Sequence, residues 1–594
     1  MNEHALWHKA KSEFSYAYDQ QTLHLVLRTK KNDVSEARVL YGDPFNWKRD
    51  GQAYDWVNET ILMQKRYSNQ LYDYFFIDIK PPYYRTKYIF LLNSQDKLYA
   101  YGSRSLFLID AHQKLYDQFD LSDFYNFPYI NFEDLHHTPS WVKDTVWYQI
   151  FPDRFCKKDS TSSLTWGNLP VHNHEIYGGN IQGIIEKLPY LSALGINGIY
   201  FTPMFESPSA HKYDTTDYFK IDPQFGTNDD FKELISQAHA LGIKVMLDGV
   251  FNHAGFYHPY FQDVIKHGEE SLYKDCFYIK NYPIINFDLT DMKKRQQLKP
   301  GDLNYLTFAF APYMPKWNTD NPLAKKHLLD CVRYWIESYD IDGWRLDVSN
   351  EISHQFLREI RSESRALKKD VFILGENWDN STPWLQGDQM DSVMNYELSF
   401  PIWKYLEHDI DLVAFKDLMV NYMALTPKNV MENMFNLVGS HDTIRIKRRL
   451  KDDVRRVKLA YLLMFISAGA PTIYYGDEIG LTGEHDPDNR RCMLWDKSDQ
   501  DLDFYHFVKK LIELRTIYPQ FKDYDFRFIE KPILVFEKGN DQPLIVILNN
   551  SNTSVTITAD DLKGNYVNLI TDQPLKICDK ITLEAYQFLL LKRK

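Results

Sequence analysis

Residues 343–348 place an arginine and an aspartate two positions apart in an otherwise apolar stretch. Side chains alternate across a strand, so Arg345 and Asp347 are predicted to share one face while Trp344 and Leu346 take the other. Burying two charges is costly unless they are paired or used in chemistry. Taken alone, the pair favours a structural ion pair, and the other polar stretches of the chain change that interpretation.

Three further apolar stretches end in acids or histidines. They end in Asp248 and His253, in Glu376 and Trp378, and in His441 and Asp442. Two carboxylates that flank a bond suit glycoside hydrolysis, one as nucleophile and the other as general acid and then base. Arg345 favours the charged form of Asp347, and the apolar surround of Glu376 promotes the protonated form that an acid needs. We therefore expect Asp347, Glu376 and Asp442 to converge on one site.

A set of eight strands alternating with helices is predicted to position these groups. The apolar strand candidates are residues 146–151, 198–202, 244–250, 343–348, 371–375, 392–396, 435–438 and 471–475. Amphipathic helix candidates lie between most of them, for example at 229–241 and 322–339. Eight such repeats predict an α/β fold, a (β/α)8 TIM barrel with its active site at the carboxyl ends of the strands.

The barrel is predicted to be flanked by two all-β domains. Residues 1–125 alternate with a period near two and predict an N-terminal β-sandwich, with a structural, sugar-binding or subunit-contact role. The barrel takes residues 126–253 and 313–519, and a second β-sandwich follows at 520–594. Residues 254–312 are rich in Tyr, Phe and Pro with little helical period, and they predict a small domain inserted after the third strand.

Composition excludes several classes of function. The net charge of −12 argues against a nucleic-acid surface. We expect no membrane span and no signal peptide, because no basic start precedes an apolar core and no stretch is long enough to cross a bilayer. The five cysteines are scattered and lack metal-site spacing, so free thiols in a reducing cytoplasm are expected.

Together, the four polar stretches resemble glycoside hydrolase family 13, the α-amylase family, and the resemblance covers nearly the whole chain. It implies that Asp347 is the nucleophile, Glu376 the acid/base and Asp442 the aspartate that stabilises the transition state. It also implies a substrate-binding set of Tyr213, Asp248, His253, Arg345, Glu351, Trp378 and His441. Tyr213, in segment 211–218, would stack on the glucose under attack; the alternative is a tyrosine packed in the core.

A narrower resemblance is to the neopullulanase, cyclomaltodextrinase and maltogenic amylase subgroup. It rests on Met314-Pro315-Lys316, on residues 348–351 and on residues 28–34. The subgroup implies cleavage of α-1,4 bonds in cyclodextrins, pullulan and short maltooligosaccharides, often with glycosyl transfer. It further implies a homodimer in which the N-terminal domain of one subunit walls the cleft of the other.

Two departures from the subgroup pattern stand out. Many members hold calcium just after the first strand, where this chain has Cys156, Lys157 and Lys158 before Asp159. Calcium prefers several oxygen ligands, so the site near Asp159 is predicted to be lost and no cofactor or metal is expected. Asp379 stands where a histidine is usual and is expected to alter the side that receives the leaving group or acceptor.

Two other functions stay open at this point. One is an α-glucosidase or glucan transferase of the same family, which would use the same chemistry. The other is an inactive sugar-binding protein, against which the intact set of Asp347, Glu376 and Asp442 argues.

Overall fold

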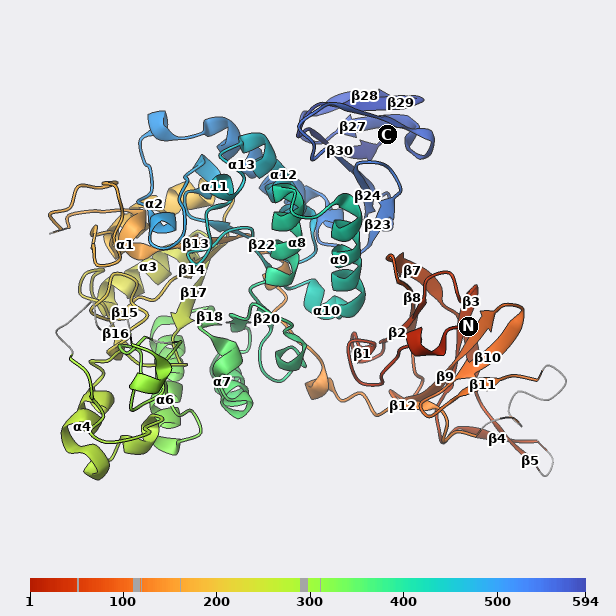
Figure 1. The fold of residues 1–594 in the computed structure, drawn as a ribbon, viewed down its shortest axis with the longest axis horizontal. Helices are drawn as coiled ribbons and strands as arrows, with labels where there is room; N and C mark the ends of the chain where they lie inside the picture. The colour runs from red at the N-terminus through yellow and green to blue at the C-terminus, as the bar shows by residue number, and fades with distance from the viewer. Residues whose placement is uncertain (51–52, 111–117, 119, 161, 289–297, 310) are drawn as a thin grey trace.

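The computed structural model describes residues 1–50, 53–110, 118, 120–160, 162–288, 298–309 and 311–594. The chain forms a barrel, and the N-terminal and C-terminal β-domains both lie to its right in the view of Figure 1. None of the helices in these described ranges is long and apolar enough to cross a membrane.

The barrel strands confirm the eight predicted from apolar stretches. They are β13 (Trp147–Ile150), β14 (Gly198–Phe201), β17 (Lys244–Gly249), β18 (Gly343–Leu346), β19 (Phe372–Gly375), β20 (Ser392–Val393), β21 (Phe435–Asn436) and β22 (Ala470–Tyr474). They pair in the order β20-β19-β18-β17-β14-β13-β22-β21. A parallel bridge between Met394 and Phe435 joins the two outer strands and closes the sheet into a barrel.

Helices cover the outside of the barrel (Figure 1). The longer ones are α2 (Ile181–Leu194), α3 (Asn228–Ala240), α6 (Pro322–Tyr339), α7 (His354–Leu367), α8 (Tyr396–Glu407), α9 (Leu412–Leu425), α12 (Val454–Ile466) and α13 (Leu502–Ile517), and the short ones are α1 (Pro152–Phe155), α10 (Lys428–Met431) and α11 (Ile446–Arg449). The helix predicted at 322–339 is confirmed with the same ends. Asn321 caps it by accepting two backbone N–H groups, and Pro322 occupies its first turn, where no N–H is needed.

Two excursions interrupt the repeats on the strand-end side. The first, which the sequence did not reveal, is the antiparallel pair β15 (Phe205–Glu206) and β16 (Asp217–Ile221) after β14. The second is the predicted insertion at 254–312, of which 289–297 and 310 lie outside the described residues. The sequence showed little helical period there, but the structure places α4 (Pro259–His267) near the start of this segment, where it buries Phe261 and Val264.

The N-terminal domain contains two facing antiparallel sheets. One consists of β1 (Ser15–Ala17), β2 (Leu23–Lys30), β8 (Tyr72–Ile79) and β7 (Gln64–Ser68). The other consists of β11 (Leu106–Leu108), β10 (Lys97–Tyr101), β9 (Thr86–Ser94), β3 (Glu36–Gly42) and β6 (Glu59–Leu62), with β12 (Tyr125–Phe127) on β9. A separate hairpin pairs β4 (Trp47–Asp50) with β5 (Ala53–Trp56).

The C-terminal domain is also antiparallel. Its six-stranded sheet contains β23 (Phe526–Ile529), β24 (Leu534–Lys538), β25 (Leu544–Leu548), β30 (Phe588–Arg593), β27 (Gly564–Asn568) and β28 (Gln573–Ile577). The pair β26 (Val555–Thr558) and β29 (Lys580–Leu583) completes it. The exact domain boundaries given by the sequence analysis stay predictions.

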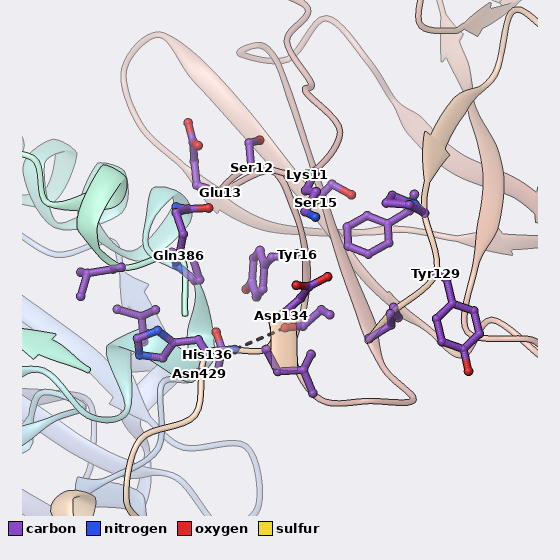
Figure 2. Close-up of a pocket in the computed structure, with 18 residues that line it drawn as sticks. Lys11, Ser12, Glu13, Ser15, Tyr16, Tyr129, Asp134, His136, Gln386 and Asn429 are labelled. Atoms are coloured by element: carbon purple, nitrogen blue, oxygen red, sulfur yellow. Dashed lines mark hydrogen bonds between the residues drawn. The ribbon is translucent and has the colours of Figure 1, made fainter. Parts of the chain in front are cut away.

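A small cavity of about 90 Å³ lies where the N-terminal domain meets the barrel (Figure 2). Tyr16 and its neighbours line it from the domain, and Gln386 and Asn429 line it from the barrel. None of the described residues that line this cavity is a predicted site residue. This cavity is therefore not the predicted site, whose residues stand at the ends of the barrel strands.

Candidate active site

Three neighbouring strands bring an arginine and the predicted acids to one end of the barrel. β17 and β18 pair Asp248 with Arg345, and Asp347 and Glu376 directly follow the last residues of β18 and β19. Because the carboxyl ends of parallel strands meet at one rim, these side chains lie together.

Arg345 is fully buried and contacts three carboxylates. Its Nη1 donates to both oxygens of Asp248, at 3.0 and 2.9 Å, and to Oδ1 of Asp347 at 2.8 Å. Its Nη2 lies 2.8 Å from Oε2 of Glu376. Two carboxylates within reach of one guanidinium are compatible with the separation of about 5–5.5 Å that a retaining glycosidase needs.

Glu376 is held through both of its oxygens. Val348 adopts a φ of +46°, which is rare for a β-branched residue, and its backbone N–H donates to Oε2 at 3.0 Å. The indole of Trp378 donates to Oε1 at 3.0 Å, and its ring stacks on Tyr396 with centroids 3.8 Å apart. The strained turn after β18 therefore serves to aim a donor at the acid.

Burial and crowding shift the pKa values of this cluster. Burial raises the pKa of Asp347, Arg345 acts in the opposite direction, and the charges of Glu376 and Asp248 raise it further. Burial also raises the pKa of Asp248 to about 6, against the effect of Arg345. Asp347 and Asp248 therefore retain a proton more strongly than isolated carboxylates do.

A second group faces this cluster from the segment after β21. Gln149 donates to Nδ1 of His441 at 2.6 Å, so the proton of this imidazole lies on Nε2, which is 3.2 Å from Asp442. Burial holds the pKa of His441 well below its ordinary value, so the ring is neutral. The Tyr213 hydroxyl lies against Nε2 of His441 and donates to Asp248 at 3.2 Å. The contacts thus join Tyr213, Asp248 and His441.

The remaining predicted residues lie at the edge of this cluster. His253 is buried, and its Nε2 donates to the backbone oxygen of Tyr213 at 3.1 Å. Glu351 is half exposed, and its carboxylate pairs with Lys316 at 3.1 Å. Lys316 also donates to Asn252, next to His253, so Glu351 belongs to the rim.

Besides Gln149, which contacts His441, sequence reasoning missed Tyr200 and Arg490 in the site. Tyr200, on β14, donates to Asp248 at 2.6 Å. Arg490 lies 3.5 Å from Asp442 and donates to the backbone oxygen of His441 at 3.0 Å. Tyr200 stands in an apolar strand, and Arg490 in a long loop, so neither had a local signal; a test of every polar side chain near a strand end would have found Tyr200.

The segment after β13 does not fit calcium. A calcium ion takes six to eight oxygen ligands, whereas the ammonium of Lys157 donates here to the backbone oxygens of Ser162 and Leu164, at 2.7 and 3.4 Å. Asn180 is occupied as well, because its oxygen accepts the Gly183 N–H at 2.9 Å and caps α2. Across the described residues, no group of three or more His, Cys, Asp or Glu side chains is arranged to hold a metal ion.

Comparison with known proteins agrees with this geometry. Residues 149–522 match the family described as alpha amylase, catalytic domain, and residues 1–131 match alpha amylase, N-terminal ig-like domain. The chain is 44% identical to a cyclomaltodextrinase of Geobacillus thermopakistaniensis, over 96% of both chains. It is 41% identical to a maltogenic alpha-amylase of Bacillus acidopullulyticus, over 98% of both chains.

A solved cyclomaltodextrinase structure matches the entire fold. The TM-score is 0.90, with 37% identity and all of both chains covered. The solved cyclomaltodextrinase therefore matches this chain over both the eight-stranded barrel and the N-terminal domain. The chain belongs to the α-amylase family of glycoside hydrolases.

Proposed function

We propose that this chain hydrolyses α-1,4-glucosidic bonds of cyclodextrins, pullulan and short maltooligosaccharides; in support, its relatives are named cyclomaltodextrinase, maltogenic alpha-amylase and neopullulanase. The observation that carries the chemistry is the single guanidinium of Arg345 between Asp347 and Glu376. One guanidinium in contact with both carboxylates is compatible with the spacing of a retaining mechanism.

In the proposed reaction, Glu376 gives its proton to the leaving oxygen while Asp347 attacks the anomeric carbon. A covalent glucosyl intermediate forms, and Glu376 then takes a proton from the water that resolves it. A sugar in place of that water would give glycosyl transfer. Arg345 counters the negative charge of Asp347, which a nucleophile must keep.

The other groups of the site would hold the glucose ring. Asp442 and neutral His441 offer one acceptor and one donor to its hydroxyls, and Tyr213 offers an aromatic face. Such contacts strengthen as the ring is distorted towards the transition state. Trp378 and the rim residue Glu351 would contact the part of the substrate that leaves.

The product profile tests this proposal. β-Cyclodextrin, pullulan and maltotriose are each incubated with the enzyme, and the anomeric form of the first products is followed by NMR. Maltose and glucose from cyclodextrin, panose from pullulan and initial α-anomers are expected. Activity on maltotriose alone would favour an α-glucosidase or transferase, and initial β-anomers would refute retention.

We propose a homodimer for the assembly. Phe45 is 74% exposed and Trp47 45% exposed on the N-terminal domain, and exposed aromatic residues of this kind are typical of a contact surface. Multi-angle light scattering is expected to give twice the chain mass, and Phe45→Ser with Trp47→Ser to give the monomer. A monomeric wild type would refute the dimer.

We also propose that the enzyme works without calcium, because Lys157 supplies the positive charge of the loop after β13 from within the chain. The melting temperature is expected to be the same in EDTA and in millimolar calcium. A rise with calcium would contradict this.

Action in the cytoplasm is proposed from the similarity to an intracellular maltogenic amylase of Bacillus subtilis, which is 38% identical over 99% of this chain.

A further inference from the structure

The connection between β15 and β16, residues 207–216, carries Tyr213 to the rim of the barrel; we name it the Tyr213 loop. Next to Tyr213 in this loop is Lys212, whose side chain is 0% exposed. A buried ammonium costs free energy unless its donors are satisfied. The reaction proposed above gives Lys212 no chemical part, so its burial needs another reason.

The ammonium of Lys212 sits in a cage of three oxygens. It donates to the backbone oxygen of Ser207 at 3.0 Å and to Oε1 of Gln224 at 2.7 Å. The third contact is an ion pair with Oδ2 of Asp222 at 2.9 Å. An ammonium has three donors, so each has one acceptor, and the match leaves none unsatisfied.

The cage ties the two ends of the Tyr213 loop together. Ser207 begins the loop, whereas Asp222 and Gln224 follow β16, which ends it. Asp222 is buried and also accepts the Ser207 backbone N–H at 2.9 Å. The Lys212 ammonium therefore holds the start of the Tyr213 loop at a fixed distance from the residues that follow β16.

The same residue sets the direction of the chain into Tyr213. Lys212 has a φ of +63°, in the left-handed region that non-glycine residues seldom adopt. Its backbone N–H donates to Oγ of Ser209 at 3.0 Å. Such a conformation persists only where the surroundings hold it, and the caged side chain supplies that hold.

Beyond this turn, the main chain of Tyr213 is held on both sides. Its N–H donates to Nδ1 of His211 at 3.1 Å, and its oxygen accepts from Nε2 of His253 at 3.1 Å. Its ring then stacks on His441, with centroids 5.6 Å apart and planes 6° from parallel.

We propose that Lys212 is the positioning residue for Tyr213: its caged ammonium holds the Tyr213 loop in the conformation that presents the tyrosine ring to the sugar. This inference rests on the proposed function, because the ring has a task only where a sugar binds. The rival explanation is that Lys212 stabilises the fold without directing Tyr213.

Two variants separate these explanations. Lys212→Met keeps the aliphatic stem and removes the donors. Lys428→Met is the matched control, because Lys428 is also buried, 1% exposed, but its ammonium contacts Tyr67 of the N-terminal domain and the backbone of Met423. Both changes are expected to lower the melting temperature.

Hydrogen exchange measures the loop itself, independently of activity. In Lys212→Met the amides of residues 209–215 are expected to exchange about tenfold faster or more, because local opening becomes easier. In Lys428→Met these amides should exchange as in the wild type. Unchanged exchange in Lys212→Met would refute the proposal.

Kinetics on β-cyclodextrin then show whether Lys212 acts through Tyr213. Lys212→Met is expected to lower kcat/KM by about 10- to 100-fold, since small misplacements of binding groups cost that much. In a Tyr213→Ala background the same change should cost less than about twofold, because the two residues act as one unit. An equal loss in both backgrounds would refute the positioning role.

The outcomes also distinguish this inference from the proposed function. A wild type that cleaves no α-glucan would remove the function, while loop exchange would still decide whether Lys212 orders the loop. An active wild type with an unaffected Lys212→Met variant would remove only the inference. Lys212→Arg is expected to fail as a replacement, because a planar guanidinium with five donors does not fit three converging oxygens.

Discussion

Two buried cations at the same end of the barrel carry different tasks. Arg345 extends between three carboxylates, each from a different strand end, and two of these are the groups proposed to react. Lys212 gathers three oxygens around one point, and none of them reaches the sugar site. Both side chains are fully buried, so burial alone does not tell a reactive site from a support.

The shape of the cation explains the difference. A guanidinium is a planar fork, so it can hold several carboxylates apart at fixed distances while countering their charge. An ammonium is a compact point charge with three converging acceptors, which suits a cage. A buried cation whose partners come from separate strand ends therefore indicates chemistry, and one whose partners surround the base of a loop indicates positioning.

The largest expected effect comes from the carboxylates that Arg345 holds. Asp347→Asn removes the proposed nucleophile, and Glu376→Gln removes the proposed acid. Each is expected to lower kcat on β-cyclodextrin by about 10⁴-fold or more, because both groups act in the same chemical steps. Steady-state kinetics measure this, with circular dichroism to check the fold.

Combining Asp347→Asn with Glu376→Gln tests whether the two carboxylates act as one unit. The double variant should lose little beyond either single variant, because residues that act as a unit are not additive. Full activity of either single variant would mean that the reacting carboxylates lie elsewhere.

The next effect follows from changing the shape of the cation while keeping its charge. Arg345→Lys leaves one ammonium that cannot reach all three carboxylates. We expect kcat to fall by about 10²- to 10³-fold, comparable to losing a preorganised electrostatic contact. Kinetics on maltotriose and β-cyclodextrin measure the loss.

Arg515→Lys is the matched control for this change. Arg515 is buried in α13, and its partners among the described residues are backbone oxygens, among them those of Phe465 and Phe521, both at 3.2 Å. It should lower stability while keeping kcat. An Arg345→Lys enzyme with wild-type kcat would show that charge alone suffices.

The same contrast explains what the sequence could predict. Apolar stretches and the polar groups at their ends are local features, so the eight strands and the Arg345 pair were readable from the sequence. Lys212 lies in segment 211–218 but carried no signal of its own, because its cage includes Gln224, twelve positions later. Arg490 lies 48 positions from Asp442, and no spacing rule brings them together.

The inserted segment shows a second limit. α4 has nine residues, and its apolar residues Phe261, Val264 and Ile265 stand at helical spacing over too few turns to stand out in a run rich in aromatic residues. It is defined instead by Pro259 in its first turn, by the His258 cap and by tertiary burial of Phe261. Local signals of this kind do not stabilise so short a helix by themselves, so it also depends on the packing of the domain.

The smallest expected effect concerns a buried group that must stay neutral, in contrast to the two cations. His258 caps α4, and Nδ1 accepts the Tyr260 N–H at 3.2 Å, so its proton lies on Nε2, which faces Nε2 of His327 at 3.3 Å. Burial lowers the pKa of His258 to about 3, and neighbouring His327 adds to this. Below pH 6.5, His258 is protonated in the unfolded chain but stays neutral in the folded chain.

Stability from this residue is therefore present above about pH 6.5 and lost as the pH falls towards 3. Between pH 7.5 and 5 the loss amounts to about 2 kcal/mol of unfolding free energy. His258→Gln keeps a capping acceptor without a titrating ring, so its unfolding free energy in urea should fall less over this range. An equal fall in both proteins would mean that other groups carry the acid sensitivity, and that a neutral buried ring does not differ from the two cations in this respect.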